Sequence, residues 1–461
     1  MGGKYKKPII NEFDLAILGA GSAGSIAAND AASRGKKVAI IEQSSIGGEC
    51  LNTTCIPTKA LLESVRLYRQ IQESSRLGVK VNSAQMDHKS IEHWVTKTIN
   101  STGVNNRTVF SEKNIKVYRG NATFVDPYTI SVNYRKITAK NFLIATGSQP
   151  RIPYIQGLFD AGFLTYRDLS TNFDYPKSIC FLGGGSVAYE YSQILSALGT
   201  KVHILEKYSH IMPNCDPEVS DLASSYLQDI GIKIHVGAQI LEVSKNAKIK
   251  HIIFNHQGRK YKLAVDEIVV SSGKAPNTDI ALENAGVRYD ENGVTTNSYM
   301  QTTQKHIYAA GEVVGLVKTA SASIKEAQIA THNIYSHKKV SMDYSAIPMT
   351  VYGYPEISYT GKTERELKMT GQLYQTAIAP IGILGKSITT QYSSGFVKLV
   401  ASHEGVVIGA SIVAPNASEI INLISYAISN EDKACDLANA IYSYPSWSEA
   451  VRIAASKIYC I

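Results

Sequence analysis

The chain has 461 residues, of which 44% are hydrophobic and 19% charged, as in ordinary globular proteins. This length predicts about three domains, and no apolar run reaches the ~18 residues that a membrane-spanning helix needs. The formal charge is +8, but lysines and arginines are scattered and do not alternate with aromatic residues, so neither nucleic acid nor a membrane is an expected partner.

The chain begins MGGKYKKPIINEFD, which is basic but lacks the apolar core of a signal peptide. Lys6 stands where a myristoylation signal has Ser or Thr. The cysteines are too few and too scattered for a secreted disulfide framework. They are Cys50, Cys55, Cys180, Cys215, Cys435 and Cys460. We therefore expect a cytoplasmic protein.

Two segments, residues 13–43 and 178–207, share one pattern. Each reads as a short apolar strand, a glycine turn, an amphipathic helix and a second strand that ends in glutamate. A βαβ unit that occurs twice, about 165 residues apart, predicts two dinucleotide-binding domains rather than a solenoid. The expected fold class is α/β, with two Rossmann-like domains.

In the first unit, Gly19, Gly21 and Gly24 form G-x-G-x-x-G between strand and helix. Such glycines permit a tight turn and let the backbone approach a pyrophosphate at the helix N-terminus. Glu42, at the end of the second strand, is placed to accept hydrogen bonds from a ribose hydroxyl. With strand, helix and acid all in place, a chance glycine turn is the weaker interpretation.

The second unit has Gly183 and Gly185, with Ala188 at the third position, which the fingerprint allows. Its terminal acid is Glu206. A carboxylate there favours the free 2′-hydroxyl of NAD and repels the 2′-phosphate of NADP. Lys207 is a cation that such a phosphate would attract, so NADP remains the less favoured alternative.

From Ala346 onward the pattern changes to short β-rich runs with turn signals, followed by expected helices at 417–430, 433–440 and 447–457. This composition predicts a separate α+β domain. The predicted organisation is a first dinucleotide-binding domain at 1–150, a second at 151–275, a return to the first at 276–345 and a C-terminal domain at 346–461.

Cys50 and Cys55 lie together in GGECLNTTCIPTK, just after the first unit. Zinc sites usually add a second cysteine pair or histidines, which are missing nearby, and two buried thiols are another alternative. A redox disulfide fits better. Five residues of ideal helix rise about 7.5 Å, beyond the ~6.8 Å Cα separation of a disulfide. The segment must therefore bend, Pro57 helps to prevent a regular helix, and a disulfide in a distorted turn is readily reduced.

GGECLNTTCIPTKALL resembles the active-site segment of the flavin-dependent pyridine-nucleotide disulfide oxidoreductases, which include dihydrolipoamide dehydrogenase, glutathione reductase and mercuric ion reductase. The resemblance covers nearly the whole chain in family order: both glycine turns, ATGS (145–148), GKAPNT (273–278), IYAAGEV (307–313), residues 347–361 and YPSWSE (444–449). It implies FAD and a nicotinamide nucleotide as cofactors. It also implies a C-terminal dimerisation domain and a homodimer whose active site is shared between subunits.

The resemblance also implies residue roles. Cys55 would face the flavin, Cys50 would exchange with a small-molecule disulfide or dithiol, and Lys59 would approach the flavin and pair with Glu190. Besides the first glycine turn and Glu42, the implied FAD-site residues are Gly120, Thr146, Gly147, Ser148, Glu312 and Ala320. The implied nicotinamide nucleotide site is formed by residues 183–190, Glu206 and Gly273. No metal cofactor is expected.

The sequence departs from the family pattern at three places. Glu312 stands in place of Asp and Lys274 in place of Arg, and both keep the charge. Tyr444 stands where dithiol-exchanging members have the His of His-Pro-x-x-x-Glu, whereas Glu449 is retained. A histidine with a pKa near 6.5 accepts a thiol proton, but a tyrosine near 10 can only donate a hydrogen bond. Loss of a positioned base costs ~10²–10⁴-fold in rate.

Three functions remain open. It also stays open whether a histidine from elsewhere in the fold acts as the base that Tyr444 cannot provide. A dihydrolipoamide dehydrogenase-like NAD(P)H:disulfide oxidoreductase is slightly favoured. Mercuric reductases resemble this chain in having Tyr, which favours reduction of a soft metal ion or another acceptor. They deliver metal through vicinal C-terminal cysteines, however, and here Cys460 is either an ordinary tail residue or a relay thiol. The third function is that of a flavoprotein that serves as a binding subunit and has little turnover. Intact Cys50, Cys55 and Lys59 argue against it, because such a subunit would not need them.

Overall fold

The computed structural model describes residues 12–461. The chain divides into two compact units, each assembled from three stretches of sequence. Unit 1 comprises residues up to 57, 96–149 and 274–343, and unit 2 comprises 58–95, 150–273 and 344–461. The predicted absence of a signal peptide and of a myristoylation signal concerns residues 1–11, which lie outside the described residues.

Unit 1 is built on a sheet with strand order β3-β2-β1-β6-β5-β4, and β18 pairs with β6. β1 is parallel to β2 and β6, with Leu18 opposite Ile41 and Ile144. Its side chains are almost entirely buried, as expected for a strand inside a parallel sheet. The strands are β1 (Phe13–Leu18), β2 (Val38–Glu42), β3 (Lys116–Arg119), β4 (Ala122–Asp126), β5 (Thr129–Val132), β6 (Arg135–Ile144) and β18 (Ile307–Ala309).

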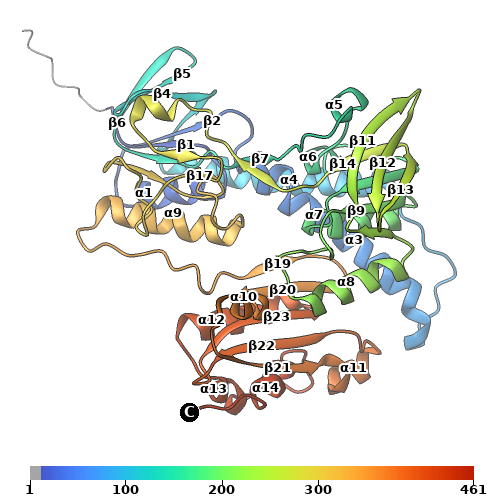
Figure 1. The fold of residues 1–461 in the computed structure, drawn as a ribbon. Helices are drawn as coiled ribbons and strands as arrows, with labels where there is room; N and C mark the ends of the chain where they lie inside the picture. The colour runs from blue at the N-terminus through green and yellow to red at the C-terminus, as the bar shows by residue number, and fades with distance from the viewer. Residues whose placement is uncertain (1–11) are drawn as a thin grey trace, which may run out of the picture. The chain divides into compact units, whose positions relative to one another are not determined.

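Two helices, α1 (Ser22–Ser33) and α9 (Ala320–Tyr335), lie side by side against this sheet (Figure 1). The buried face of α1 consists of glycine and alanines, including Ala27 and Ala31, which lets neighbouring backbones approach closely. The first predicted βαβ unit is therefore confirmed as β1-α1-β2.

The second predicted βαβ unit is confirmed in unit 2 as β8-α7-β9. Its parallel sheet has the order β10-β9-β8-β14, and an antiparallel sheet with the order β11-β12-β13 follows (Figure 1). The elements are β8 (Ser178–Leu182), α7 (Ser186–Ala197), β9 (Lys201–Glu206), α8 (Pro217–Asp229), β10 (Lys233–Val236), β11 (Gln239–Asn246), β12 (Ile249–His256), β13 (Arg259–Val265) and β14 (Glu267–Val270).

The C-terminal part of unit 2 is an antiparallel sheet, order β19-β20-β23-β22-β21, packed against helices. Ile412, Ile424 and Val451 are fully buried in this core. The predicted α+β character and the expected helices are confirmed to within about two residues. The elements are β19 (Met349–Val351), β20 (Glu356–Gly361), α10 (Glu364–Thr370), β21 (Tyr374–Pro380), η3 (Ile381–Ile383), α11 (Gly385–Thr390), β22 (Phe396–Ser402), β23 (Val407–Ala414), α12 (Ala417–Ser429), α13 (Ala434–Asn439) and α14 (Glu449–Ala455).

A buried lysine, Lys398 of β22, joins segments of unit 2 that are distant in sequence. Its Nζ lies 3.0 Å from Asp216, 2.6 Å from Glu364 and 3.2 Å from Glu218. Lys398 and Asp216 are each only 1% exposed. Burial by itself raises the pKa of Glu364, but hydrogen bonds from Lys368 and Lys398 lower that pKa to about 2. The lysine thus helps to keep the Glu364 carboxylate ionised.

The remaining elements are short or pass between the units in sequence. Helices α3 (Cys55–Glu73) and α4 (His88–Glu112) each contribute residues to both units. The others are α2 (Gly48–Asn52), η1 (Ser74–Leu77), β7 (Ser148–Pro150), α5 (Leu158–Ala161), α6 (Tyr166–Leu169), β15 (Lys274–Pro276), η2 (Leu282–Ala285), β16 (Tyr289–Asp290) and β17 (Gly293–Val294). Among residues 12–461, no helix is long and apolar enough to cross a membrane.

Candidate functional site

In the glycine turn of unit 1, two positions have no room for a side chain and a third position has open space beside it. Gly19 has a φ of +107°, and a Cβ there would collide with the carbonyl of Ala145. A Cβ on Gly24 would collide with the carbonyl of Gly19. At Gly21 the nearest atom to such a Cβ lies 3.9 Å away. The turn therefore leaves room at the N-terminus of α1, as a dinucleotide pyrophosphate requires.

Glu42 and Glu206 hold equivalent places at the ends of β2 and β9. The carboxylate of Glu42 accepts hydrogen bonds from the backbone N–H of Ala20 (2.8 Å) and of Ser44 (2.8 Å). Glu206 likewise accepts from Gly184 (2.6 Å) and Tyr208 (2.9 Å). Both carboxylates brace their glycine turns. Oε1 of Glu42 also accepts from the Ser44 hydroxyl (3.1 Å), whereas its Oε2 and both oxygens of Glu206 keep a second lone pair that can accept a ribose hydroxyl.

The second glycine turn repeats this arrangement in unit 2. Gly183 has a φ of +115°, and a Cβ there would lie 2.7 Å from the carbonyl of Ser271. No atom lies within 4 Å of the corresponding position at Gly185, and Ala188 is buried in α7. The Nζ of Lys207 lies over the ring of Tyr208, 4.7 Å from its centroid. The second turn thus also suits a pyrophosphate.

The cysteine segment bends as predicted. Cys50 lies in α2, Cys55 is the first residue of α3, and the helical path breaks at Thr53 and Thr54. Both cysteines are half-buried. The partial positive charge at the N-terminus of α3 favours an anion such as a thiolate at Cys55.

Lys59 and Glu190 form an ion pair, as the resemblance implied. Lys59 Nζ lies 3.0 and 2.9 Å from the two carboxylate oxygens of Glu190, which is 7% exposed. Sequence reasoning missed Tyr352, whose backbone N–H donates to Glu190 at 2.9 Å and whose ring lies 4.6 Å below the ammonium group. Only tertiary structure links these residues, so no local sequence signal could have found Tyr352.

The departures from the family pattern at Glu312 and Lys274 turn out to contact each other. Lys274 Nζ lies 2.8 and 3.0 Å from the two carboxylate oxygens of Glu312. The hydroxyl of Ser148 also donates to Glu312. Two of the expected FAD-site residues, Ser148 and Glu312, are thereby hydrogen-bonded to each other within unit 1.

The other expected cofactor residues lie at turns and helix starts. Gly120 and Gly273 have φ values of +139° and +106°, so both use the glycine-favouring region. The Thr146 hydroxyl donates to the carbonyl of Asn277 at 2.7 Å, and Asn277 N–H donates to the carbonyl of Gly147 at 2.9 Å. Ala320 is the first residue of α9, which the side chain of Thr319 caps.

Tyr444 lies on the segment between α13 and α14, and Glu449 is the first residue of α14. Tyr444 is 78% exposed, and its hydroxyl lies against the α-carbon of Gly385. The Glu449 carboxylate accepts a hydrogen bond from the Ser446 N–H (3.1 Å). Among the residues that the structure describes, no hydrogen bond joins Glu449 to Tyr444. Glu449 therefore orients the backbone of this segment rather than the tyrosine hydroxyl.

The fold forms a second cysteine pair that the sequence analysis missed. Cys460, considered a tail residue or a relay thiol, forms a disulfide with Cys435 of α13. The two are 25 residues apart in sequence, so spacing gave no signal. Within residues 12–461, no group of three or more Cys, His, Asp or Glu side chains is arranged to hold a metal ion.

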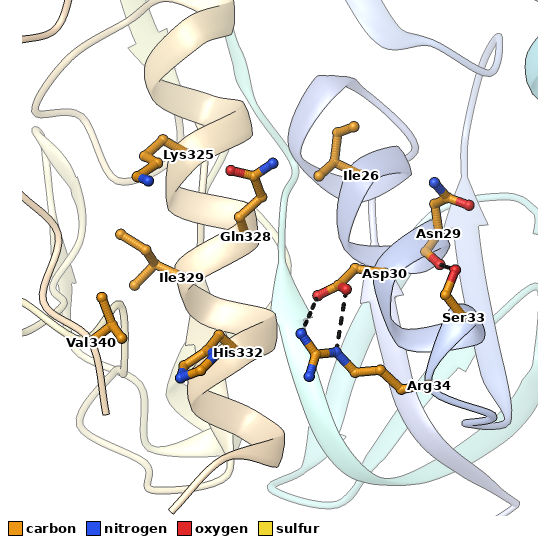
Figure 2. A pocket seen from close by; sticks show the side chains of 10 residues that line it. All are labelled: Ile26, Asn29, Asp30, Ser33, Arg34, Lys325, Gln328, Ile329, His332 and Val340. Atoms are coloured by element: carbon orange, nitrogen blue, oxygen red, sulfur yellow. Dashed lines mark hydrogen bonds and ion pairs between the residues drawn. The ribbon is translucent and has the colours of Figure 1, made fainter. Parts of the chain in front are cut away.

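A cavity of about 510 Å³ lies between α1 and α9 (Figure 2). Its lining includes Lys325, His332 and the ion pair between Asp30 and Arg34, whose shortest N···O distance is 3.2 Å. These residues belong to the C-terminal half of α1, to Arg34 just after it and to α9, beyond the glycine turn at residues 19–24. The cavity is therefore not the expected dinucleotide site.

Comparison with known proteins places the chain in a family. Residues 13–330 match the family described as pyridine nucleotide-disulphide oxidoreductase, and residues 347–455 match its dimerisation domain. The match covers well over half of the chain. The protein therefore belongs to the pyridine nucleotide-disulfide oxidoreductases, and it is an enzyme that uses FAD and a nicotinamide nucleotide.

Relatives and solved structures fall within this class. A mercuric reductase of Lysinibacillus sphaericus is 30% identical over 453 residues, covering 97% of this chain and 83% of that protein. A dihydrolipoyl dehydrogenase of Bacillus subtilis is 30% identical over 448 residues, covering 95% and 96%. The Cu(II) complex of the HOCl-induced flavoprotein disulfide reductase RclA from Escherichia coli matches with a TM-score of 0.87 and 26% identity, covering 97% and 100%.

Proposed function

We propose that this oxidoreductase transfers electrons from NADH, through FAD and the Cys50–Cys55 pair, to a thiophilic metal ion such as Hg²⁺ or Cu²⁺. The observation that carries the proposal is Tyr444, an exposed phenol in place of a base, with no bond to Glu449 among the described residues. A tyrosine can ligate or donate a hydrogen bond but does not take a proton from a thiol at neutral pH. Metal reduction needs no such proton transfer.

We assign FAD to the first glycine turn and NADH to the second by their order in the family pattern, and the room at both turns supports a bound dinucleotide. FAD would be held in unit 1 by the turn at Gly21 and by Glu42. The other residues that the resemblance implies for this site are Gly120, Thr146, Gly147, Ser148, Glu312 and Ala320. NADH would be held in unit 2 by the turn at Gly185, by Glu206 and by Gly273. When bound, FAD supplies a two-electron link between the nicotinamide and the cysteines. We prefer NADH because the 2′-phosphate of NADPH would meet the carboxylate of Glu206.

The cysteines and Lys59 would carry out the remaining steps. Thiolates of Cys50 and Cys55 are the soft ligands that Hg²⁺ and Cu⁺ prefer. The two electrons and the charge balance as NADH plus Hg²⁺ giving NAD⁺, H⁺ and Hg⁰, or with two Cu²⁺ giving two Cu⁺. The ammonium of Lys59, fixed by Glu190, would supply a positive charge toward the flavin ring.

Reduction of lipoamide-type disulfides, or the reverse oxidation of dihydrolipoamide, is the second candidate, and the relationship to dihydrolipoyl dehydrogenases favours it. We further propose that the chain works as a cytoplasmic homodimer, which the matched dimerisation domain supports. Tyr444 would then complete the partner subunit's site. The predicted domain boundaries form part of this proposal: 1–150 together with 276–345 would bind FAD, 151–275 would bind NADH, and 346–461 would form the dimer.

An acceptor screen tests the proposal. NADH oxidation by the purified holoenzyme is followed with Hg²⁺, Cu²⁺, lipoamide and oxidised glutathione, each against a Cys50→Ser control. We expect turnover with a metal ion to exceed turnover with lipoamide by at least tenfold and to disappear in the control. Faster turnover with lipoamide would instead establish the second candidate.

A further inference from the structure

A second cysteine pair lies outside the expected redox site. Cys435 is in the first turn of α13, and its Cα lies 6.2 Å from that of Cys460. This separation is within the ~4.4–6.8 Å range of protein disulfides. The backbone N–H of Cys435 also donates a hydrogen bond to Cys460 Sγ at 3.0 Å. The two sulfurs are thus placed for bond formation.

Polar contacts hold the tail in this position without help from the sulfurs. The Tyr459 N–H donates to the Gln375 side-chain oxygen at 3.0 Å, and the Gln375 amide donates to the Tyr459 carbonyl at 2.9 Å. Lys457 Nζ donates to the Ile378 carbonyl at 2.7 Å, and Lys433 Nζ donates to the carbonyl of Ile461. Reduction of the disulfide would therefore leave the two thiols close together and able to re-form it.

Small thiols and disulfides can reach the pair. Both sulfur-bearing residues are half-buried, and the flanking Tyr459 and Ile461 are 81% and 74% exposed. Cys180 and Cys215 differ, because both are buried in the interior of unit 2. Burial also raises the pKa of the Cys215 thiol to about 12. Reversible chemistry is therefore expected at Cys435 and Cys460 and not at the buried thiols.

The disulfide encloses the segment that carries Tyr444. Cys435 and Cys460 are 25 residues apart, and the chain between them includes Tyr444, Glu449 and α14. Ile441 is fully exposed and Tyr444 is 78% exposed, so much of this connection is not fixed by burial. Closing such a loop covalently removes conformations from its opened state.

We propose that Cys435 and Cys460 form a second, reversible thiol–disulfide site, whose oxidised form restrains the loop containing Tyr444. A low-molecular-weight disulfide would oxidise it in two exchanges. One protein thiolate first forms a mixed disulfide and releases one small thiol; the other protein thiolate then displaces the second small thiol and closes the Cys435–Cys460 bond. Two electrons pass to the small disulfide, and the two protein protons leave with the released thiols.

The first test uses holoenzyme with Cys50→Ser and Cys55→Ser, so that the expected redox pair cannot contribute. Samples treated with oxidised glutathione or with dithiothreitol are alkylated in the folded state and analysed by peptide mass spectrometry. We expect Cys435 and Cys460 to be alkylated together after dithiothreitol and cross-linked after glutathione disulfide. Cys180 and Cys215 should stay unlabelled in both samples. Alkylation of Cys435 and Cys460 after both treatments would overturn the site.

The second test asks whether the bond restrains the loop. Hydrogen exchange of the peptides covering 440–448 is compared between oxidised and reduced samples of the same protein. We expect several-fold slower exchange after oxidation, lost in Cys460→Ser and retained in the matched Cys215→Ser variant. Equal exchange in both redox states would overturn the proposed restraint. The first test uses protein that lacks Cys50 and Cys55, and neither test supplies NADH or measures its oxidation, so both outcomes are independent of the proposed function.

Discussion

Lys59 Nζ contacts both carboxylate oxygens of Glu190, at 3.0 and 2.9 Å, although the two residues are 131 positions apart in sequence. Glu190 is almost fully buried, and a buried carboxylate is stable only when its charge is compensated. The lysine is 31% exposed, so part of its charge is solvated. The pair therefore fixes the direction of the ammonium group more than it stabilises the fold.

Removing the lysine charge should affect both stability and electron transfer. We expect Lys59→Met to cost about 1–3 kcal/mol of unfolding free energy, because it leaves Glu190 with an unmatched charge. We also expect NADH-driven flavin reduction to slow by roughly tenfold, equal to about 1.4 kcal/mol in the barrier. Thermal unfolding and anaerobic stopped-flow absorbance measure the two effects.

A surface ion pair on the same helix is the matched control. Glu63 and Arg66 are both about half exposed, so Glu63→Gln should change stability by less than ~0.5 kcal/mol. An equal loss in Glu63→Gln and Lys59→Met would refute a special role for the Lys59–Glu190 pair.

The two active-site cysteines should differ spectroscopically. Anaerobic NADH titration of the wild-type enzyme should produce long-wavelength absorbance from a thiolate next to oxidised flavin. Cys55→Ser should abolish this band. Cys50→Ser should retain a thiolate at Cys55 and should therefore make the band stronger. Cys180→Ser serves as a control, since that thiol is buried in β8. An unchanged spectrum in Cys55→Ser would rule out the assignment of Cys55.

Tyr444 decides between the two candidate substrates. Tyr444→His introduces a group that ionises near pH 6.5 and can act as a base for thiol exchange. We expect dihydrolipoamide turnover to rise by ~10²-fold, the low end for a positioned base, with a rate that increases with pH through about 6.5. Tyr444→Phe should leave dihydrolipoamide turnover unchanged. Equal turnover in the histidine and phenylalanine variants would contradict this interpretation.

The Lys274–Glu312 pair should behave as a unit. Glu312→Asp shortens one partner by a methylene, and Lys274→Arg lengthens the other, so we expect each single change to lower FAD retention after desalting. The double variant should recover much of it, with a coupling of about 1 kcal/mol in unfolding free energy. Additive losses in the double variant would show that the two substitutions act independently.

Stability should depend on pH through the histidines of unit 2. His203 of β9 stacks on His235 at 6.3 Å between ring centroids. Burial lowers the pKa of His203 from about 6.5 to about 4, and the charges of Lys233 and His235 act in the same direction. Between these pH values the unfolded chain binds a proton that the folded chain does not. This stabilising contribution is therefore complete above about pH 6.5 and is lost as the pH falls toward 4.

Replacement of His203 should flatten this dependence. Urea titration gives the unfolding free energy at pH 7.5 and at pH 5. The difference between these two free energies should be smaller in His203→Gln than in the wild type, by an amount on the order of 1 kcal/mol after allowing for solvent screening. His403→Gln, at an exposed position, should keep the wild-type dependence. Identical pH dependence in both variants would exclude His203 as the source.

The sequence predicted the parts of the fold that are encoded locally. Both βαβ units followed from glycine spacing and from apolar strands, and the bend between Cys50 and Cys55 followed from the geometry of a disulfide. The bend is observed as the break between α2 and α3. These features depend on neighbouring residues, so the linear sequence carries them.

Contacts between distant positions could not be predicted in the same way. Tyr352, which follows β19, contacts Lys59 of α3 only through the tertiary fold, and the Cys435–Cys460 pair depends on where the tail runs. Glu312 and Lys274 were noted as separate departures from the family pattern, yet their side chains form an ion pair. The hydrogen bond from the Ser446 N–H to the Glu449 carboxylate likewise could not be read from the sequence.

Lys398 has a consequence for how unit 2 unfolds. Its carboxylate partners come from the start of α8 and from α10, so the β10-β9-β8-β14 sheet and the C-terminal sheet share one charge network. Separating the two sheets would take Lys398 and Glu364 away from Asp216 and leave the Asp216 carboxylate without its lysine. Breaking a buried ion pair in this way costs several kcal/mol. The two sheets should therefore melt in a single cooperative transition, although each has its own hydrophobic core.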